Sequence, residues 1–115
     1  PAMNFVAAKV DTAHGANAPA FGATVAFSGG LPSAGSSVEI GLRPQHLRVT
    51  EGNTHRVEMT EALGGVSFIH VSAETGEKLV IEARGDVTPA IGSRIGIAFD
   101  AKDALFFDAD GKRLR

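Results

Sequence analysis

The sequence predicts an all-β domain, built as a sandwich or small barrel of about eight or nine short strands with little or no helix. Three observations support this fold class. Short apolar or alternating stretches recur along the 115 residues, turn signals separate them about every 8–12 residues, and no stretch has a convincing helical period. The 14 glycines are well above average usage and fit the many turns and corners of such a fold.

The N-terminal third alternates between strand and turn patterns. Residues 5–10 alternate apolar with other side chains, which is typical of a half-buried strand. Residues 11–19 contain Asp, Gly, Asn and Pro and are predicted to be turn, whereas residues 21–27 show the cleanest two-residue alternation in the chain. Residues 28–36 are rich in Gly and Ser but lack the Gly-Lys-Ser/Thr ending of a phosphate-binding loop, so we interpret them as a connection.

A strand that ends in a forced stop follows this loop, where residues 40–47 read Ile-Gly-Leu-Arg-Pro-Gln-His-Leu. Pro44 cannot donate to a strand ladder and pushes Arg43 toward an extended conformation. The guanidinium of Arg43 could tie together carbonyls or a carboxylate at the corner, and Gln45 and His46 could satisfy neighbouring backbone groups. We interpret the corner as a structural clamp; the alternative is a contact or regulatory surface.

The remaining two-thirds of the chain repeats the strand pattern. Strands are predicted at residues 47–49, 57–62, 66–71, 79–83, 95–99 and 105–107. Residues 51–53 and 74–77 are predicted turns, and the second of these is a hairpin turn with Gly76 at a positive φ. Residues 100–103 form a tight turn of at most one helical turn, and the tail at residues 112–115 can pair back.

Composition restricts the possible functions. A length of 115 residues corresponds to one domain, residues 1–115, with 43% hydrophobic and 21% charged residues. The net charge of −2 gives no electrostatic footprint for nucleic acid, and the absence of cysteine excludes disulfides and thiolate metal sites. No apolar run approaches the roughly 20 residues of a membrane span, and no signal peptide is visible. The chain begins at Pro1 rather than Met, which suggests a fragment.

No motif for catalysis or metal binding emerges. The chain has four histidines: His14, His46, His55 and His70. None lies at a ligand-pair spacing with another, and we expect His70 to be partly buried and hydrogen-bonded rather than a metal ligand. The Asp108-x-Asp110-Gly sequence lacks the remaining ligands of a calcium loop, and no Ser occupies a Gly-x-Ser-x-Gly turn. We therefore expect no catalytic residues and no metal.

Oligonucleotide binding is the weakest alternative. Small barrels bind single strands through aromatic side chains interleaved with Lys and Arg on a strand face. This chain has no Trp or Tyr, and its phenylalanines lie on apolar strands, where they are predicted to belong to the core. We expect no nucleic acid as a partner.

Four motifs in order carry a resemblance to a known family. Along the chain they are residues 1–5, residues 40–47, residues 61–65 with 68–71, and residues 92–100 with 105–108. Together they resemble the TOBE domain, the C-terminal regulatory domain of the ATP-binding subunits of ABC importers, in the branch for maltose, other sugars and glycerol-3-phosphate. Besides the corner residues Arg43, Pro44, Gln45 and His46, the motif residues are Leu63, Gly64, Gly92, Phe99, Asp100, Phe107 and Asp108.

Three positions depart from the family pattern. Gln45 replaces the usual glutamate, Val66 stands where an acid is common, and Phe106 stands in for a histidine. Ion pairs or titratable contacts made at these positions in relatives are not expected here.

The resemblance implies an OB-like barrel that does no chemistry itself. An ATPase domain, with ATP and Mg²⁺ as its cofactors, would precede residue 1, and this segment itself would hold no cofactor. Implied partners are a second copy of the subunit, the membrane-spanning importer subunits and a regulatory protein, at the inner face of the cytoplasmic membrane. The alternative to this regulatory and dimerisation role is a small-ligand barrel that binds an oxyanion such as molybdate, through backbone amides that a sequence does not reveal.

Overall fold

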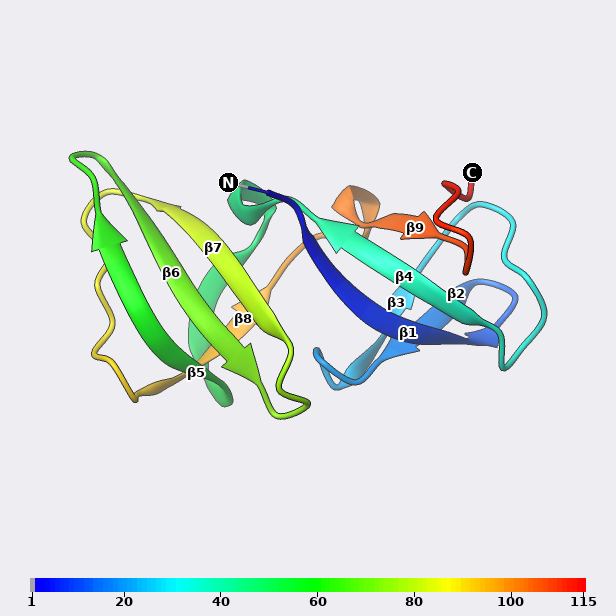
Figure 1. The fold of residues 1–115 in the computed structure, drawn as a ribbon, viewed down its shortest axis with the longest axis horizontal. Coiled ribbons are helices and arrows are strands. Elements are labelled where there is room, and N and C mark those ends of the chain that lie inside the picture. The colour runs from blue at the N-terminus through cyan, green and yellow to red at the C-terminus, as the bar shows by residue number, and fades with distance from the viewer. Residues whose placement is uncertain (1) are drawn as a thin grey trace.

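The computed structural model describes residues 2–115 and arranges them in two curled antiparallel sheets that lie end to end (Figure 1). The molecule is elongated, with axes of 43, 23 and 21 Å. Pro1, the first residue of the segment 1–5 that resembles the family, lies outside the described residues. Within residues 2–115 there are nine strands and two short 3-10 turns, so the predicted all-β class is confirmed.

The first sheet is formed mainly by the N-terminal part of the chain and has the strand order β3-β2-β1-β4-β9. Its strands are β1 (Asn4–Thr12), β2 (Gly15–Ala18), β3 (Ala23–Ala26), β4 (Ser37–Leu42) and β9 (Leu105–Phe107). Each neighbouring pair is antiparallel, and β3 and β9 are the two edges. The alternation predicted for residues 5–10 is realised in β1, where buried and exposed side chains alternate from Asn4 to Val10.

The second sheet is formed by consecutive strands in the middle of the chain and has the order β7-β6-β5-β8. Its strands are β5 (Arg48–Ala62), β6 (Val66–Ala73), β7 (Lys78–Arg84) and β8 (Arg94–Ala98). The turn between β5 and β6 places Gly64 and Gly65 at φ of 70° and 97°, while Leu63 N donates to Val66 O over 2.8 Å. Two successive positive φ angles suit a tight hairpin turn with right-handed strand twist, which explains the glycine pair.

The chain crosses between the sheets twice. The turn η1 (Pro44–His46) connects β4 to β5, and the turn η2 (Ala101–Asp103) connects β8 back to β9. Because β4 pairs with β9 and β5 pairs with β8, the two connections run side by side in opposite directions. The second crossing confirms the tight turn expected at residues 100–103.

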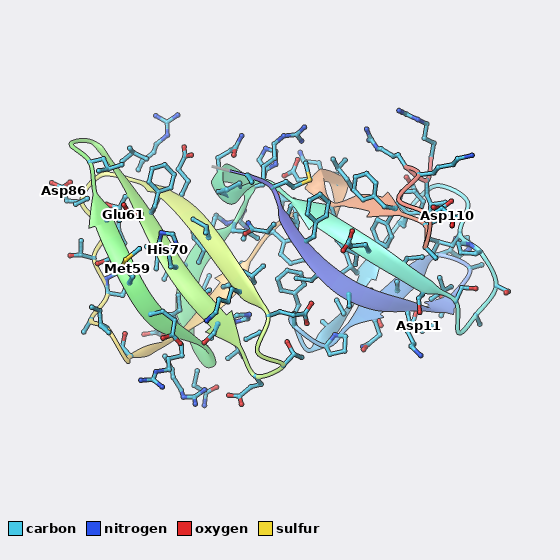
Figure 2. The ribbon with its side chains drawn as sticks, viewed as in Figure 1. Asp11, Met59, Glu61, His70, Asp86 and Asp110 are labelled. Atoms are coloured by element: carbon cyan, nitrogen blue, oxygen red, sulfur yellow. The ribbon has the colours of Figure 1, made fainter. Side chains whose placement is uncertain are left out.

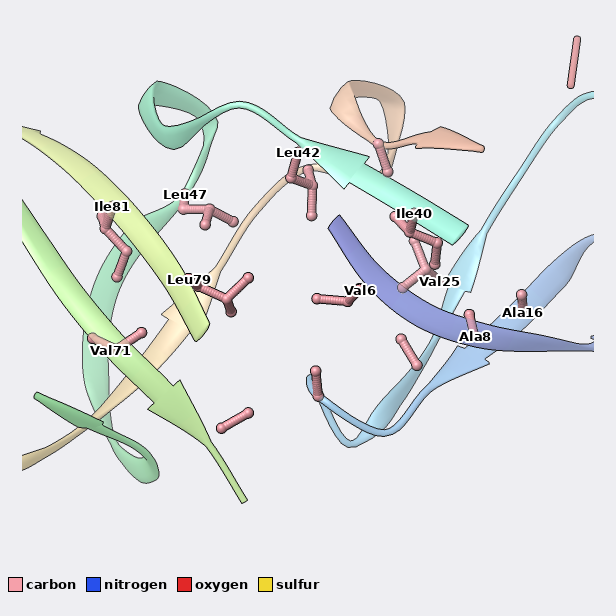
Figure 3. Packing of buried hydrophobic residues seen from close by; sticks show 14 of the residues in the cluster. Val6, Ala8, Ala16, Val25, Ile40, Leu42, Leu47, Val71, Leu79 and Ile81 are labelled. Atoms are coloured by element: carbon pink, nitrogen blue, oxygen red, sulfur yellow. The ribbon is translucent and has the colours of Figure 1, made fainter. Parts of the chain in front are cut away.

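One hydrophobic core extends through both sheets and across their junction. Figure 3 shows Val6 and Leu42 of the first sheet on the side that faces Leu47, Leu79 and Val71. Each of these five side chains is at most 1% exposed. Burial of an aliphatic side chain of this size contributes about 1.5–3 kcal/mol, so the junction is a stabilised contact between the sheets. None of the helical turns within residues 2–115 is long and apolar enough to cross a membrane.

Three strand boundaries differ from the sequence-based expectations. Residues 11–19 are not all turn, because β2 lies at Gly15–Ala18; its glycine and alanines are small enough to pack closely, and a Cβ at Gly15 would meet Thr24 Cγ2 at 2.7 Å. In the alternating stretch 21–27, only Ala23–Ala26 forms the strand.

The predicted strands at 47–49 and 57–62 are parts of the single long strand β5. The residues between them, predicted as a turn, form a bulge, since Thr50 pairs with Gly96 and His55 pairs with the adjacent Ile95. The bulge lies directly over Gly96, where a Cβ would meet Glu51 O at 2.6 Å. A bulge bends a strand without ending it, and Gly and Asn in the sequence do not distinguish it from a turn.

Candidate functional site

The corner at residues 40–47 is the first connection between the two sheets. Ile40, Leu42 and Leu47 are at most 1% exposed, and Pro44 is also buried. Gly41 is buried between the rings of the first sheet's outer face, since a Cβ there would meet Met3 Sδ at 2.5 Å and a ring carbon of Phe107 at 3.1 Å. The apolar and small residues of the motif are therefore explained by close packing at the junction.

The corner closes through its own backbone rather than through the Arg43 side chain. His46 N donates to Arg43 O over 2.9 Å, and Leu47 N donates to Pro44 O over 3.3 Å. The Arg43 residue is exposed, and its guanidinium takes part in none of the hydrogen bonds or ion pairs found within residues 2–115. The expectation that Arg43 clamps the corner is wrong, because the turn closes through its own backbone bonds and the exposed guanidinium has no acceptor among residues 2–115.

Gln45 and His46 also differ from the expectation that they satisfy backbone groups. Gln45 is exposed, while His46 is half-buried and its Nδ1 is buried with no hydrogen-bond partner among residues 2–115. A buried nitrogen without a partner costs free energy. His46 Nδ1 is therefore an unsatisfied hydrogen-bonding atom of the corner.

The second connection carries another group of motif residues. Phe99 packs against Phe21 with ring centroids 4.8 Å apart, and Phe107 meets Phe5 edge-on at 5.7 Å. Asp100 precedes η2 and lies 4.0 Å from Arg48, an exposed ion pair between the two connections. The structure thus brings Phe107 next to Gly41 of the corner and Asp100 near Arg48, directly after the corner, while Phe99 packs against Phe21.

The remaining motif residues have local roles away from the two connections. Leu63 and Gly64 form the β5–β6 turn at the far end of the second sheet (Figure 1), where the Leu63 side chain is 59% exposed. Gly92 N donates to Val57 O over 2.7 Å in the loop before β8. Asp108 Oδ1 accepts from Asp110 N and Lys112 N, both over 2.9 Å, which makes it a turn residue rather than a calcium ligand.

Among the positions that depart from the family pattern, Phe106 has the clearest structural consequence. It is fully buried and stacks on Phe27 with centroids 4.5 Å apart and an interplanar angle of 27°. Val66 is half-buried at the start of β6. The apolar ring of Phe106 fills the first sheet's core. A histidine in the same place would need hydrogen-bond partners for its buried ring nitrogens.

His70 behaves as predicted. It is half-buried, and its Nε2 lies 2.9 Å from Glu61 Oε1. Figure 2 shows these two side chains pointing toward each other on neighbouring strands β5 and β6, with Met59 beside them. Within residues 2–115, no group of three or more His, Cys, Asp or Glu side chains could hold a metal ion.

Two polar residues that the sequence did not single out connect the sheets. Asn4, only 7% exposed, donates from Nδ2 to Val80 O over 2.9 Å and accepts at Oδ1 from Val80 N over 2.8 Å. A neighbouring contact joins Ala7 N to Glu77 Oε2 over 2.9 Å. The sequence signal for Asn4 was its position in phase with the buried residues of β1, where a polar side chain needs a partner.

His55 forms the corresponding contact on the other side of the junction. It is 2% exposed, its Nε2 lies 2.9 Å from Ala20 O, and its Nδ1 lies 2.8 Å from Thr54 Oγ1. Burial lowers the pKa of His55, although the hydrogen bond to Ala20 and the charge of Glu74 oppose this shift. A neutral ring fits the site, with Nε2–H donating to Ala20 O and Nδ1 accepting from the Thr54 hydroxyl.

Comparison with known proteins identifies the family. The profile of the TOBE domain matches residues 40–107, from β4 through both connections to β9. The chain belongs to the TOBE domain family. The resemblance deduced from the four motifs is thereby confirmed.

Its curated relatives are ATP-binding subunits of importers. This TOBE domain is 36% identical over 99% of its length to the sn-glycerol-3-phosphate import ATP-binding protein UgpC of Ruegeria pomeroyi, and covers 32% of that protein. It is 31% identical over 99% of its length to UgpC 3 of Agrobacterium fabrum, covering 36% of it. The lactose transport ATP-binding protein LacK of Rhizobium radiobacter is 33% identical over 73% of this chain and 24% of its own length. The chain therefore spans about a third or less of these relatives.

A solved structure shares the fold. The TOBE domain superposes on the cytoplasmic molybdate-binding protein ModG with a TM-score of 0.64 over 90% of this chain and 94% of that one, at 12% identity. Such low identity shows the fold alone.

Proposed function

We propose that this domain is the non-catalytic regulatory and dimerisation domain of the ATP-binding subunit of an ABC importer for sugars or glycerol-3-phosphate-like solutes. The observation that carries the proposal is the 36% identity to an sn-glycerol-3-phosphate import ATP-binding protein across 99% of this chain. In the parent chain this domain would follow an ATPase domain, which binds ATP and Mg²⁺.

The geometry is consistent with a structural and regulatory role. The family-signature residues of the corner and of Phe99 to Phe107 lie at the two connections between the sheets. They position one sheet against the other, and Arg43 and Gln45 remain exposed beside them. A domain of this design would contact other proteins rather than catalyse a reaction. Its partners would be a second copy of the subunit, the membrane-spanning subunits and a regulatory protein at the cytoplasmic face of the membrane.

The reading frame upstream of Pro1 provides the first test. We expect it to encode a Walker A motif and an ABC signature. Nucleotide binding requires a phosphate-binding loop with a Gly-Lys-Ser/Thr ending, which residues 28–36 lack. An upstream segment without either motif would overturn the proposal.

A biochemical test separates the regulatory role from ATP binding. Sedimentation velocity is measured without nucleotide for the full-length subunit and for a subunit ending just before Ala2. We expect the full-length subunit to remain dimeric, and the truncated subunit to become monomeric while still binding ATP. The control is the full-length Lys9→Gln subunit, with a change at an exposed position on β1. Equal dimerisation of the full-length and truncated subunits would contradict the dimerisation role.

The oxyanion alternative is supported by the fold alone. ModG is a molybdate-binding protein, but 12% identity does not extend that ligand to this chain. The curated relatives favour the importer role.

A further inference from the structure

The first sheet has an open cleft beside its unpaired edges. In the part of the chain that the structure describes, β3 and β9 are edge strands that do not pair with each other. A cleft of about 620 Å³ lies between the end of β3, the turn η2 and the C-terminal tail. Apolar side chains form much of its wall: Phe27, Ala104, Leu105 and Leu114. This volume falls within the range of small-molecule sites, about 300–1,000 Å³.

The rim of this cleft is cationic. It is lined by Lys102, Arg113 and Arg115, with His14 beside them, and no Asp or Glu side chain is among its lining residues. The α-carboxylate of Arg115 in the 115-residue chain lies at the same rim, where Arg115 O accepts from Gly30 N over 3.2 Å. The ion pairs found within residues 2–115 are Arg48–Asp100, His70–Glu61 and Arg94–Glu74, so none of them involves a rim residue. A chain of net charge −2 thus gathers three of its 11 Lys and Arg residues, uncompensated by side-chain ion pairs, at one cleft.

A second, largely apolar hollow adjoins the cleft along the β3 edge. Its volume is about 330 Å³, and it shares Ala26 and Ala101 with the first. Its wall includes Phe21, Ile97 and Phe99, with Phe21 and Phe99 packed at 4.8 Å. The two hollows therefore adjoin at Ala26 and Ala101.

We propose that this combined cleft binds a small organic anion, with a phosphate or carboxylate head at the cationic rim and an apolar body along β3. Guanidinium groups present planar donors that match a carboxylate or phosphate, and charge-assisted hydrogen bonds of this kind are the stronger ones. The apolar extension gains from burial of the ligand's body. An inorganic oxyanion would use the rim alone and leave the extension unfilled. This inference is independent of the importer assignment.

Isothermal titration calorimetry and amide NMR of the 115-residue chain test the site. Hexyl phosphate and hexanoate carry both a head and a body, inorganic phosphate and molybdate carry the head alone, and hexanol carries the body alone. We expect hexyl phosphate or hexanoate to bind more tightly than the other three, with amide shifts at Phe27, Lys102 and Leu114. The tighter of the two identifies the preferred head group. Raising the salt concentration should weaken binding, because the rim charges are exposed.

Two variants separate the head from the body. The double variant Lys102→Gln/Arg113→Gln removes two rim charges and should weaken binding by about tenfold or more, because hydrogen bonds to charged groups are the stronger ones. Ala101→Leu fills the boundary between the two hollows and should weaken hexyl phosphate while leaving inorganic phosphate unchanged. Lys9→Gln, an exposed charge change outside the cleft, is the matched control.

Three results would overturn the proposal. The first is no binding of either hexyl phosphate or hexanoate. The second is equal affinity for hexyl phosphate and inorganic phosphate or molybdate, which would mean that the body contributes nothing. The third is equal weakening by Lys9→Gln and by the double rim variant. Thermal unfolding of each variant shows whether it remains folded, and Ala101→Leu, at an exposed position, keeps the test valid if the double variant does not fold.

Discussion

The two sheets belong to one core but fill it with different side chains. The second sheet buries branched aliphatic residues: Val57, Ile69, Val71, Leu79, Ile81 and Ile95. The first sheet buries three alanines, Ala8, Ala16 and Ala18, beside larger residues that include Val6, Val10, Val25, Ile40 and Leu42. The aromatic pair Phe106 and Phe27 supplies the volume that the alanines lack.

The family match divides along the same line. Residues 40–107 include every strand of the second sheet, but only β9 and the end of β4 from the first. The well-packed sheet and the two connections are thus the part shared with the TOBE family profile, while β1 to β3 precede it. The open cleft lies against β3. Its opposite wall comes from residues 101–105 of the matched region, so the cleft lies between the two parts of the chain.

The largest effect is expected from removing the aromatic filler of the first sheet. Phe106→Ala should destabilise the chain by about 3–5 kcal/mol, because it leaves a cavity among small side chains that cannot collapse into it. Chemical denaturation followed by far-UV circular dichroism measures this loss. Phe5→Ala, at a residue 47% exposed, is the matched control and should cost much less. Equal losses would show that the first sheet does not depend on Phe106.

The next largest effect concerns the joint between the sheets. Asn4→Ala should cost about 1–3 kcal/mol, because it leaves the N–H and C=O of Val80 without their partners at the junction. Asn17→Ala, at an exposed position on β2, serves as the control for amide removal. If both substitutions cost the same small amount, the Asn4 contact does not hold the sheets together.

A pH-dependent effect is expected at the other side of the junction. Because the folded-state pKa of His55 is lowered, the unfolded chain binds a proton more readily than the folded one as the pH falls below about 6.5. The stability from His55 is therefore fully present above pH 6.5 and declines from there toward the lowered pKa. His55→Gln should flatten this decline, measured as the free energy of unfolding between pH 8 and pH 5. His14→Gln, at an exposed histidine, is the control, and the proposed origin is excluded if His55→Gln keeps the full decline.

The smallest effect is expected at the surface ion pair between the two connections. Arg48 and Asp100 are 4.0 Å apart, and each side chain is 57% exposed. Arg48→Gln should change the free energy of unfolding by at most about 1 kcal/mol, since water and salt screen exposed pairs. A larger loss in thermal denaturation at physiological salt would mean that this pair, rather than buried packing, joins the connections.

Local patterns predicted much of the fold. Alternation predicted β1 and β7, a run that is apolar on both faces predicted β6, and the turn pattern around Gly76 predicted the hairpin at 74–77. The small residues of β2 were missed, because Gly15 and Ala16 have weak strand preferences and are buried by tertiary contacts. The division into two sheets also escaped prediction, since pairing between distant strands such as β4 and β9 leaves no local signal.

The site was predictable as a location but not as a mechanism. Residues 40–47 were recognised as a corner, yet the role assigned to Arg43 was wrong, because the donor capacity of a guanidinium does not reveal whether an acceptor is near. The Asn4–Val80 contact and the cationic rim each bring together residues that are far apart in the sequence. Lys102 and His14, for example, meet only when η2 returns to the first sheet.

The central claim is that the two connections and the buried contacts across the junction make the sheets one cooperative unit. Residue-resolved thermal unfolding by amide NMR tests it most directly, because the amides of Val6 and Ile40 report the first sheet while those of Ile69 and Ile81 report the second. We predict a single shared midpoint for the parent chain and separated midpoints for Asn4→Ala. Native signals from Ile69 and Ile81 that persist in the parent chain well after those of Val6 and Ile40 have vanished would contradict the claim.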